Sequence, residues 1–128
     1  MSYSVAYAVI FLCIVFEANA LWCNVTLKFE NDGHQKARVD VVIPGMELES
    51  DPIFFNQYKD KKHVTVTGEN CEKAPWIFTT KQYDPKQEKW IVKKTVKVRY
   101  AGNGWVRGVI KDNYDLIFLD RYGIITSS

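Results

Sequence analysis

The sequence is poor in the side chains from which catalytic and metal sites are usually built. It contains only two histidines, His34 and His63, and neither has a cysteine or a second histidine at metal-ligand spacing. Beyond position 20 the serines are Ser50, Ser127 and Ser128, and no G-x-S-x-G motif occurs. Because general bases and nucleophiles are usually drawn from these residue types, we expect a non-enzymatic protein without a metal or cofactor. A small hydrolase with a dispersed site is the less favoured alternative.

Three carboxylates near the C-terminus are the remaining candidates for a cation site. Asp112, Asp115 and Asp120 lie close together in the sequence, but they lack the loop register that fixes a calcium coordination shell. We interpret them as turn and surface residues.

Long apolar runs are also scarce. Residues 5–16 form one, and it is too short for a membrane-spanning helix, which needs ~20 apolar residues. Followed by Ala18-Asn19-Ala20, the run is typical of a secretory signal peptide that is cleaved after Ala20. We therefore predict a signal peptide over residues 1–20 and one secreted, extracellular domain over residues 21–128, with no transmembrane span. An uncleaved signal anchor, or a buried N-terminal strand or helix, is the alternative.

A large excess of charge of one sign is missing too. The chain has 17 lysines and arginines and 15 acidic residues, and removing residues 1–20 removes Glu17, which leaves 17 against 14, or +3. This excess is too small to hold nucleic acid by itself, and export also argues against that partner. We expect an extracellular glycan or protein as the partner instead.

Two cysteines remain once the leader is gone, and a glycosylation sequon lies beside one of them. Cys23 and Cys71 allow a single intramolecular disulfide, with an intermolecular bridge or free thiols as the alternatives. Asn24-Val25-Thr26 meets the acceptor rule for N-glycosylation. If Cys23 faces the core, strand alternation turns Asn24 toward water, and we predict a glycan there.

Alternating apolar and polar residues predict strands throughout the chain. Residues 23–29 alternate, a turn signal follows at 31–34, and residues 38–43 return as a second strand, which predicts a hairpin. Residues 89–100 and 105–110 predict another hairpin closed by the glycine-rich stretch 101–104. Seven or eight short strands with turns between them predict an all-β domain, a single antiparallel β-sandwich.

Tryptophans and a basic stripe are the candidate ligand-binding residues. Trp76 and Trp90 lie in apolar alternation, which favours the core for both. Trp105 follows a glycine-rich stretch, and an exposed ring there could stack on a sugar. Strand alternation places three cations on one face of residues 89–100, where they could meet sulfates or lipid headgroups, although a solvated outer face is the simpler interpretation. These cations are Lys93, Lys97 and Arg99.

The chain resembles the small secreted β-rich proteins of nematodes. The residues that carry the resemblance are the leader joined to residues 23–26, the stop at Ile43-Pro44-Gly45, and Cys71 followed by Pro75-Trp76. The resemblance implies secretion and assigns no functional residue. We therefore expect a secreted domain that binds an extracellular ligand, either a glycan or an anionic surface. A structural or defence-related protein that acts through protein contacts is the alternative.

Overall fold

The computed structural model describes residues 22–127, and nearly all regular structure in them is β-strand, which confirms the all-β prediction. The predicted signal peptide, residues 1–20, lies outside the described residues. A single 3-10 turn, η1 (Pro44–Met46), follows the second strand. The strands are β1 (Trp22–Asn31), β2 (Ala37–Ile43), β3 (Leu48–Glu49), β4 (Ile53–Phe55), β5 (Lys61–Glu69), β6 (Trp76–Asp84), β7 (Lys89–Ile110) and β8 (Leu116–Ser127). Within residues 22–127, no helix is long and apolar enough to cross a membrane.

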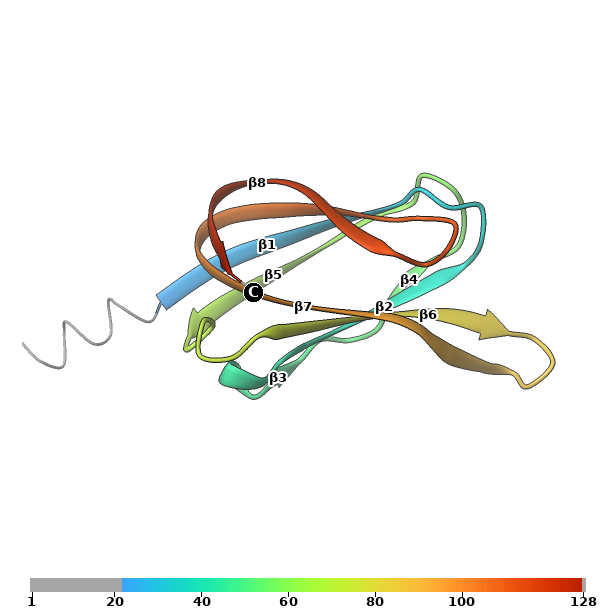
Figure 1. Cartoon of the computed structure of the whole chain (residues 1–128), viewed down its shortest axis with the longest axis horizontal. Coiled ribbons are helices and arrows are strands. Elements are labelled where there is room, and N and C mark those ends of the chain that lie inside the picture. The colour runs from blue at the N-terminus through green and yellow to red at the C-terminus, as the bar shows by residue number, and fades with distance from the viewer. Residues whose placement is uncertain (1–21, 128) are drawn as a thin grey trace, which may run out of the picture.

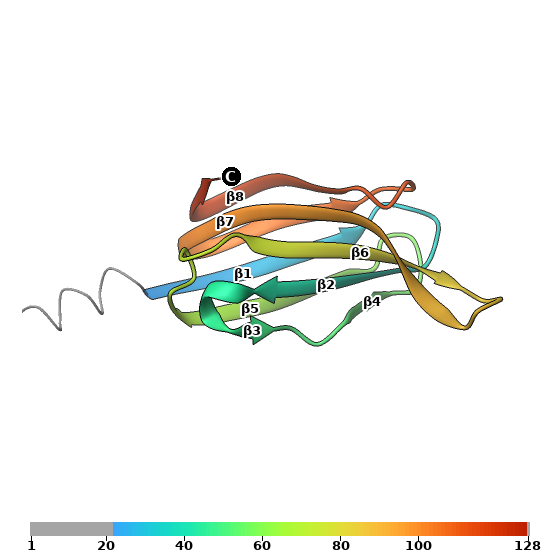
Figure 2. The same cartoon turned by 60° about the horizontal axis from the view of Figure 1, so that its bottom comes forward.

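The strands form one curled sheet rather than two separate antiparallel sheets. Their order is β3-β2-β6-β7-β1-β5, with β4 beside β2 and β8 beside β7 (Figures 1 and 2). The 22-residue strand β7 joins the two halves, because its first part pairs with β6 and its second part with β1 and β8. The β1–β7 pair is parallel. The prediction of a single antiparallel sandwich is therefore wrong at this pair, and the sheet is mixed.

The hairpin predicted from residues 23–29 and 38–43 does not form. Both strands exist, but β1 pairs with β5 and β7, whereas β2 pairs with β3, β4 and β6. The turn at residues 31–34 carries the chain from one half of the curled sheet to the other. Alternation fixes which side chains face the core, but it does not fix the partner strand.

The second predicted hairpin is also absent, because β7 runs through residues 101–104 without reversing. Its glycines allow the backbone of β8 to come close to that of β7 and do not form a turn. A Cβ on Gly104 would collide with the backbone carbonyl oxygen of Tyr122, and one on Gly102 would lie 2.6 Å from that of Gly123. Gly102 also has a φ of 105°, which L side chains rarely adopt. The glycines let β8 approach β7 closely at this irregularity in their pairing.

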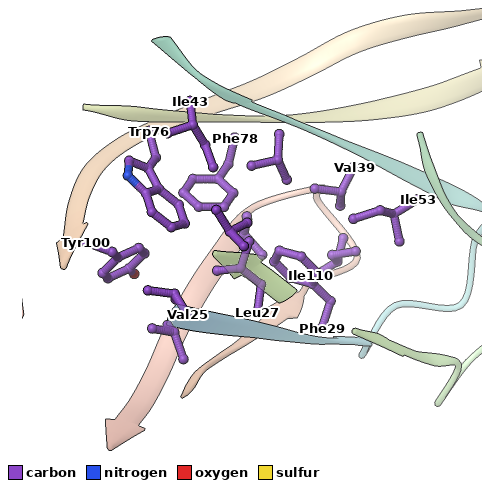
Figure 3. Packing of buried hydrophobic residues seen from close by; sticks show 14 of the residues in the cluster. Val25, Leu27, Phe29, Val39, Ile43, Ile53, Trp76, Phe78, Tyr100 and Ile110 are labelled. Carbon is purple, nitrogen blue, oxygen red and sulfur yellow. The ribbon is translucent and has the colours of Figure 1, made fainter. Parts of the chain in front are cut away.

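The core lies inside the curl, between the inward faces of the strands (Figure 3). Trp76 is fully buried, as predicted, and its Nε1 donates a hydrogen bond of 2.6 Å to the carbonyl oxygen of Cys71. The predicted disulfide between Cys23 and Cys71 is present and ties the start of β1 to the segment before β6. Other core side chains come from β1, β2, β6 and β7, among them Val25, Leu27, Val39, Ile43, Phe78, Tyr100 and Ile110.

Trp90 lies outside this core, contrary to the prediction. Thr80 pairs with Lys94 and Lys81 with Val92, so β7 has one extra residue, Lys93, at that point. This bulge reverses the alternation of the strand before it. Val92 is therefore exposed, and Trp90 is half-buried against Tyr83 and Phe54, with ring centroids 5.3 and 5.6 Å away. The β6–β7 hairpin that carries Trp90 projects beyond the rest of the molecule (Figures 1 and 2).

Candidate ligand-binding face

The outward side of β5, β1, β7 and β8, here called the outer face, carries polar, basic and aromatic side chains. Cross-strand neighbours in a sheet share one side, so the register places these side chains in rows. One row consists of Thr65, Thr26, Trp105 and Tyr122. The next row consists of His63, Lys28, Arg107 and Asp120.

A groove of about 440 Å³ lies over β5, β1 and β7, where side chains of the outer face meet Phe29 and Lys62, which leave the sheet on its other side. Its lining is rich in cations, and we call it the basic groove. The lining residues are Thr26, Lys28, Phe29, Glu30, Lys61, Lys62, His63 and Arg107. Three lysines, an arginine and a histidine thus surround a single carboxylate.

Several of the charges in the basic groove are only partly neutralised. Glu30 lies 3.4 Å from Lys59 Nζ, outside the lining, while Lys61 and Lys62 make no ion pair with any residue from 22 to 127. Lys28 Nζ lies 4.7 Å from the ring centroid of Trp105, a cation–π contact. The groove therefore holds an excess of positive charge.

Arg107 is oriented by a forked contact with Asp120. Its Nε and Nη2 donate to the two carboxylate oxygens at 2.9 and 3.1 Å. This hydrogen bond lowers the pKa of Asp120 and raises the pKa of Arg107, so both groups stay charged over a wide pH range. The fork holds the guanidinium plane while other N–H groups remain available to a ligand.

The residues predicted to bind a ligand do not form one cluster. Trp105 lies on the outer face and is half-buried beneath Lys28. Lys97 and Arg99 lie on the same side of β7, but Arg99 is six positions from Trp105, about 20 Å along an extended strand. Lys93 lies in the bulge. The predicted stripe is therefore separate from the basic groove.

The structure adds residues that the sequence analysis did not single out. Lys28, Lys61 and Arg107 lie far apart in the sequence, and only the β5–β1 and β1–β7 registers bring them together. Each of them lies in a strand with recognisable alternation, which could have placed it on an outward face. The parallel pairing of β1 with β7 leaves no comparable local signal.

Asn24 lies on the outer face at the other end of β1 from the basic groove. Its side chain is half-buried, and its Oδ1 accepts a hydrogen bond of 3.3 Å from Thr67 Oγ1. It is four positions from Lys28, or about 13 Å along the strand. Glycosylation at Asn24 stays a prediction.

The three C-terminal carboxylates each contact a different basic side chain. Asp112 Oδ1 lies 3.4 Å from His34 Nδ1, Asp115 Oδ1 lies 3.3 Å from Lys94 Nζ, and Asp120 is held by Arg107. Among residues 22–127 no group of three or more histidines, cysteines or carboxylates could hold a metal ion.

No family model matches the chain, and no curated protein matches it. Among solved structures, a disulfide-locked mutant of intermedilysin with human CD59 matches with 10% identity and a TM-score of 0.43, over 77% of this chain and 24% of that chain. Listeriolysin O matches with 8% identity and a TM-score of 0.40, over 80% and 23%. The membrane-binding domain of pneumolysin matches with 10% identity and a TM-score of 0.41, over 76% and 96%. The chain thus spans about a quarter of the length of the larger toxins, and likeness at this level carries no argument about function. The resemblance to nematode secreted proteins stays a prediction.

Proposed function

We propose that the chain is a secreted, non-enzymatic domain whose basic groove binds the anionic groups of an extracellular glycan, such as sulfates or carboxylates. The observation that carries the proposal is the cluster of Lys28, Lys61, Lys62 and Arg107 around a groove of about 440 Å³ with one carboxylate in its lining. A groove holds a polysaccharide chain along its length. Arginine and lysine N–H groups are strong donors to sulfate and carboxylate oxygens.

Secretion is part of the proposal and is supported by two independent features. The Cys23–Cys71 disulfide suits an oxidising compartment. The sequon at Asn24 lies about 13 Å from Lys28 on an outward strand position, so a glycan there would flank the basic groove without filling it. Intact mass spectrometry of the secreted protein, before and after enzymatic deglycosylation, tests both the new N-terminus at Leu21 and the glycan.

Heparin resin tests the basic groove. We expect the protein to be retained at ~0.15 M NaCl and to elute as salt screens the contacts. The variant K28Q/K61Q removes two groove cations and should elute at a clearly lower salt concentration than the native protein.

The matched control is K86Q/K89Q, which removes two exposed lysines from the projecting β6–β7 hairpin and changes the net charge equally. Equal shifts for the two variants would show attraction by net charge alone and contradict the basic groove. Retention of the native protein on vesicles of anionic lipid but not on heparin would contradict the glycan.

A second candidate, protein–protein contact, is favoured by the apolar surface of β8. Four large apolar side chains of this strand are between 43% and 72% exposed. They are Ile117, Leu119, Tyr122 and Ile125. Contiguous exposed apolar side chains often mark interfaces between proteins. A stable partner that is recovered with the native protein from secreted material, and lost with I125Q, would support this function.

A further inference from the structure

The curled sheet does not close on itself, and its two ends face each other across a second groove. In the described part of the chain, β5 is the last strand at one end, and β3 and β4 pair only with β2 at the other. Between them lies a hollow of about 500 Å³, here called the seam groove. It is lined by Val41, Ile43, Leu48, Ser50, Asp51, Pro52, Ile53, Phe54, Lys62, His63, Val64, Thr65 and Val66.

The floor and rim of the seam groove are mainly apolar. Its floor reaches core residues, including Val41, Ile53 and Val66, all of which are buried. On its rim, Leu48 and Phe54 are 39% and 43% exposed, although both are large apolar side chains. A volume of about 500 Å³ with an apolar lining falls within the ordinary range of small-molecule sites.

The wall formed by β3 and β4 is poorly suited to a guest β-strand. β3 has two residues and β4 has three, and Pro52 between them has no backbone N–H. Ser50 is already used internally, because its N–H donates to the Val41 carbonyl oxygen at 2.9 Å and its Oγ accepts from the Val41 N–H at 3.3 Å. This wall offers apolar contact but no continuous row of backbone donors. A guest strand would need such a row, whereas an aliphatic chain does not.

Lys62 brings a positive charge to the border between the two grooves, with His63 beside it. Lys62 and His63 line both the seam groove and the basic groove, and both side chains are exposed. By strand alternation Lys62 leaves β5 on the side of Phe29 and His63 on the side of Lys28. Asp51 is the only carboxylate in the lining of the seam groove, and it belongs to the opposite wall. An anionic head group would therefore be attracted to the β5 side of the groove and repelled from the opposite wall.

We propose that the seam groove binds the aliphatic chain of an anionic amphiphile of the fatty-acid class, with its head group beside Lys62 and His63. This inference goes beyond the proposed function, because it concerns a different hollow on the inward side of β5. Burial of an alkyl chain is favourable in proportion to the apolar surface removed from water, so chain length should control affinity.

The test uses the disulfide-bonded protein and a fluorescent C16 or C18 fatty acid. We expect saturable binding at one site, which weakens as the chain is shortened. V64F places a larger apolar side chain at a half-buried position of the seam groove, and should weaken binding by about tenfold or more by occupying the hollow. L48Q reduces the apolar rim at an exposed position and should weaken binding less. V92Q, at an exposed apolar position of the β6–β7 hairpin outside both grooves, is the control.

Two outcomes would overturn the inference. Equal weakening by V92Q and V64F would place the fatty acid on the general surface, and equal affinity for an alcohol of the same chain length would remove the role of the anionic head group. Thermal unfolding of each variant shows whether V64F remains folded. If V64F does not fold, the weaker fatty-acid binding expected of L48Q tests the seam groove in its place. Heparin retention is measured in parallel. If the native protein binds the fatty acid but is not retained on heparin, only the proposal for the basic groove is contradicted. If it is retained on heparin but does not bind the fatty acid, only the proposal for the seam groove is contradicted.

Discussion

The side-chain amide of Asn31 donates a hydrogen bond of 3.2 Å to the carbonyl oxygen of Gln57, 26 positions further along the chain. The same Nδ2 donates to the Gln35 carbonyl oxygen at 2.9 Å, while Oδ1 accepts from the Gly33 N–H at 3.0 Å. Asn31 is fully buried. One amide thus joins the β1–β2 connection to the β4–β5 connection at the point where the chain changes from one half of the sheet to the other.

The variant N31D should be strongly destabilised. A carboxylate keeps the acceptor for Gly33 but loses both donors, and it places a charge beside two carbonyl oxygens in a buried site. We expect the free energy of unfolding at pH 7 to fall by at least ~2 kcal/mol. Urea unfolding measures the change. N103D, at an exposed position of β7, is the control, and a loss as large as that of N31D would contradict the role of the buried amide.

Gly104 should tolerate no side chain. In G104A the new Cβ would meet the Tyr122 carbonyl oxygen, so the paired strands β7 and β8 must separate there. We expect a loss of about 3 kcal/mol or more in the free energy of unfolding, or a failure to accumulate folded protein. In G33A the new Cβ meets only the flexible Gln35 side chain, so this variant should lose much less. Similar urea midpoints for native protein and G104A would contradict the close approach.

The Cys23–Cys71 disulfide should contribute a large share of the stability. Its cysteines are 48 positions apart, and closing a loop of that size gives roughly 4 kcal/mol as an upper figure from chain entropy. The double variant C23A/C71A, or the native protein with a reductant, should therefore unfold at a much lower urea concentration. A change below ~1 kcal/mol would show that the bridge adds little to the packing around Trp76.

The Asp40 carboxylate should make stability sensitive to acid. Burial raises its pKa, but hydrogen bonds from Arg38 and Lys81 outweigh burial and hold the pKa below its ordinary value of 3.8. The Arg38 and Lys81 contacts are 2.8 and 2.7 Å long. Since the unfolded chain binds the proton more readily, this contribution is complete well above pH 3.8 and is lost as the pH falls below it.

The variant D40N measures this contribution. We expect it to lose about 1–3 kcal/mol relative to native protein at pH 7, with the difference narrowing as the pH falls below ~4. Urea unfolding at several pH values gives both curves. D51N changes an exposed carboxylate, and its free energy of unfolding should change with pH in the same way as that of the native protein. A D40N deficit that stays constant down to pH 3 would show that packing, not charge, is lost.

Alternation in the sequence was sufficient to predict most strands but not their partners. Residues 23–29 form a strand with Cys23 inward and Asn24 outward, as expected from a period of two. Their partners, β5 and β7, are far away in the sequence, and the nearest strand is not one of them. Pairing depends on the long-range packing of the core, for which a single sequence carries little signal.

Glycines and bulges explain the remaining errors. A glycine that permits close approach looks the same in the sequence as one that permits a turn, so the sequence predicts a hairpin at residues 101–104 that does not form. One extra residue, Lys93, reverses the alternation and moves Trp90 and Val92 to the outside. The sequence does not predict the basic groove either, because strands that are distant in the sequence form it. Trp105 was identified, but the lysine over its ring lies on β1 and is 77 positions away.

The parallel pairing of β1 and β7 also fixes an order of events in synthesis. Asn24 pairs with Asn103 and Asn31 with Ile110, so each contact spans 79 positions. β1 can pair with β5 once residue 69 has been made, but its other edge must wait until residue 110. Long loops close slowly, and an unpaired strand edge invites aggregation. Between these two points in synthesis, the edge of β1 that later pairs with β7 therefore stays unpaired.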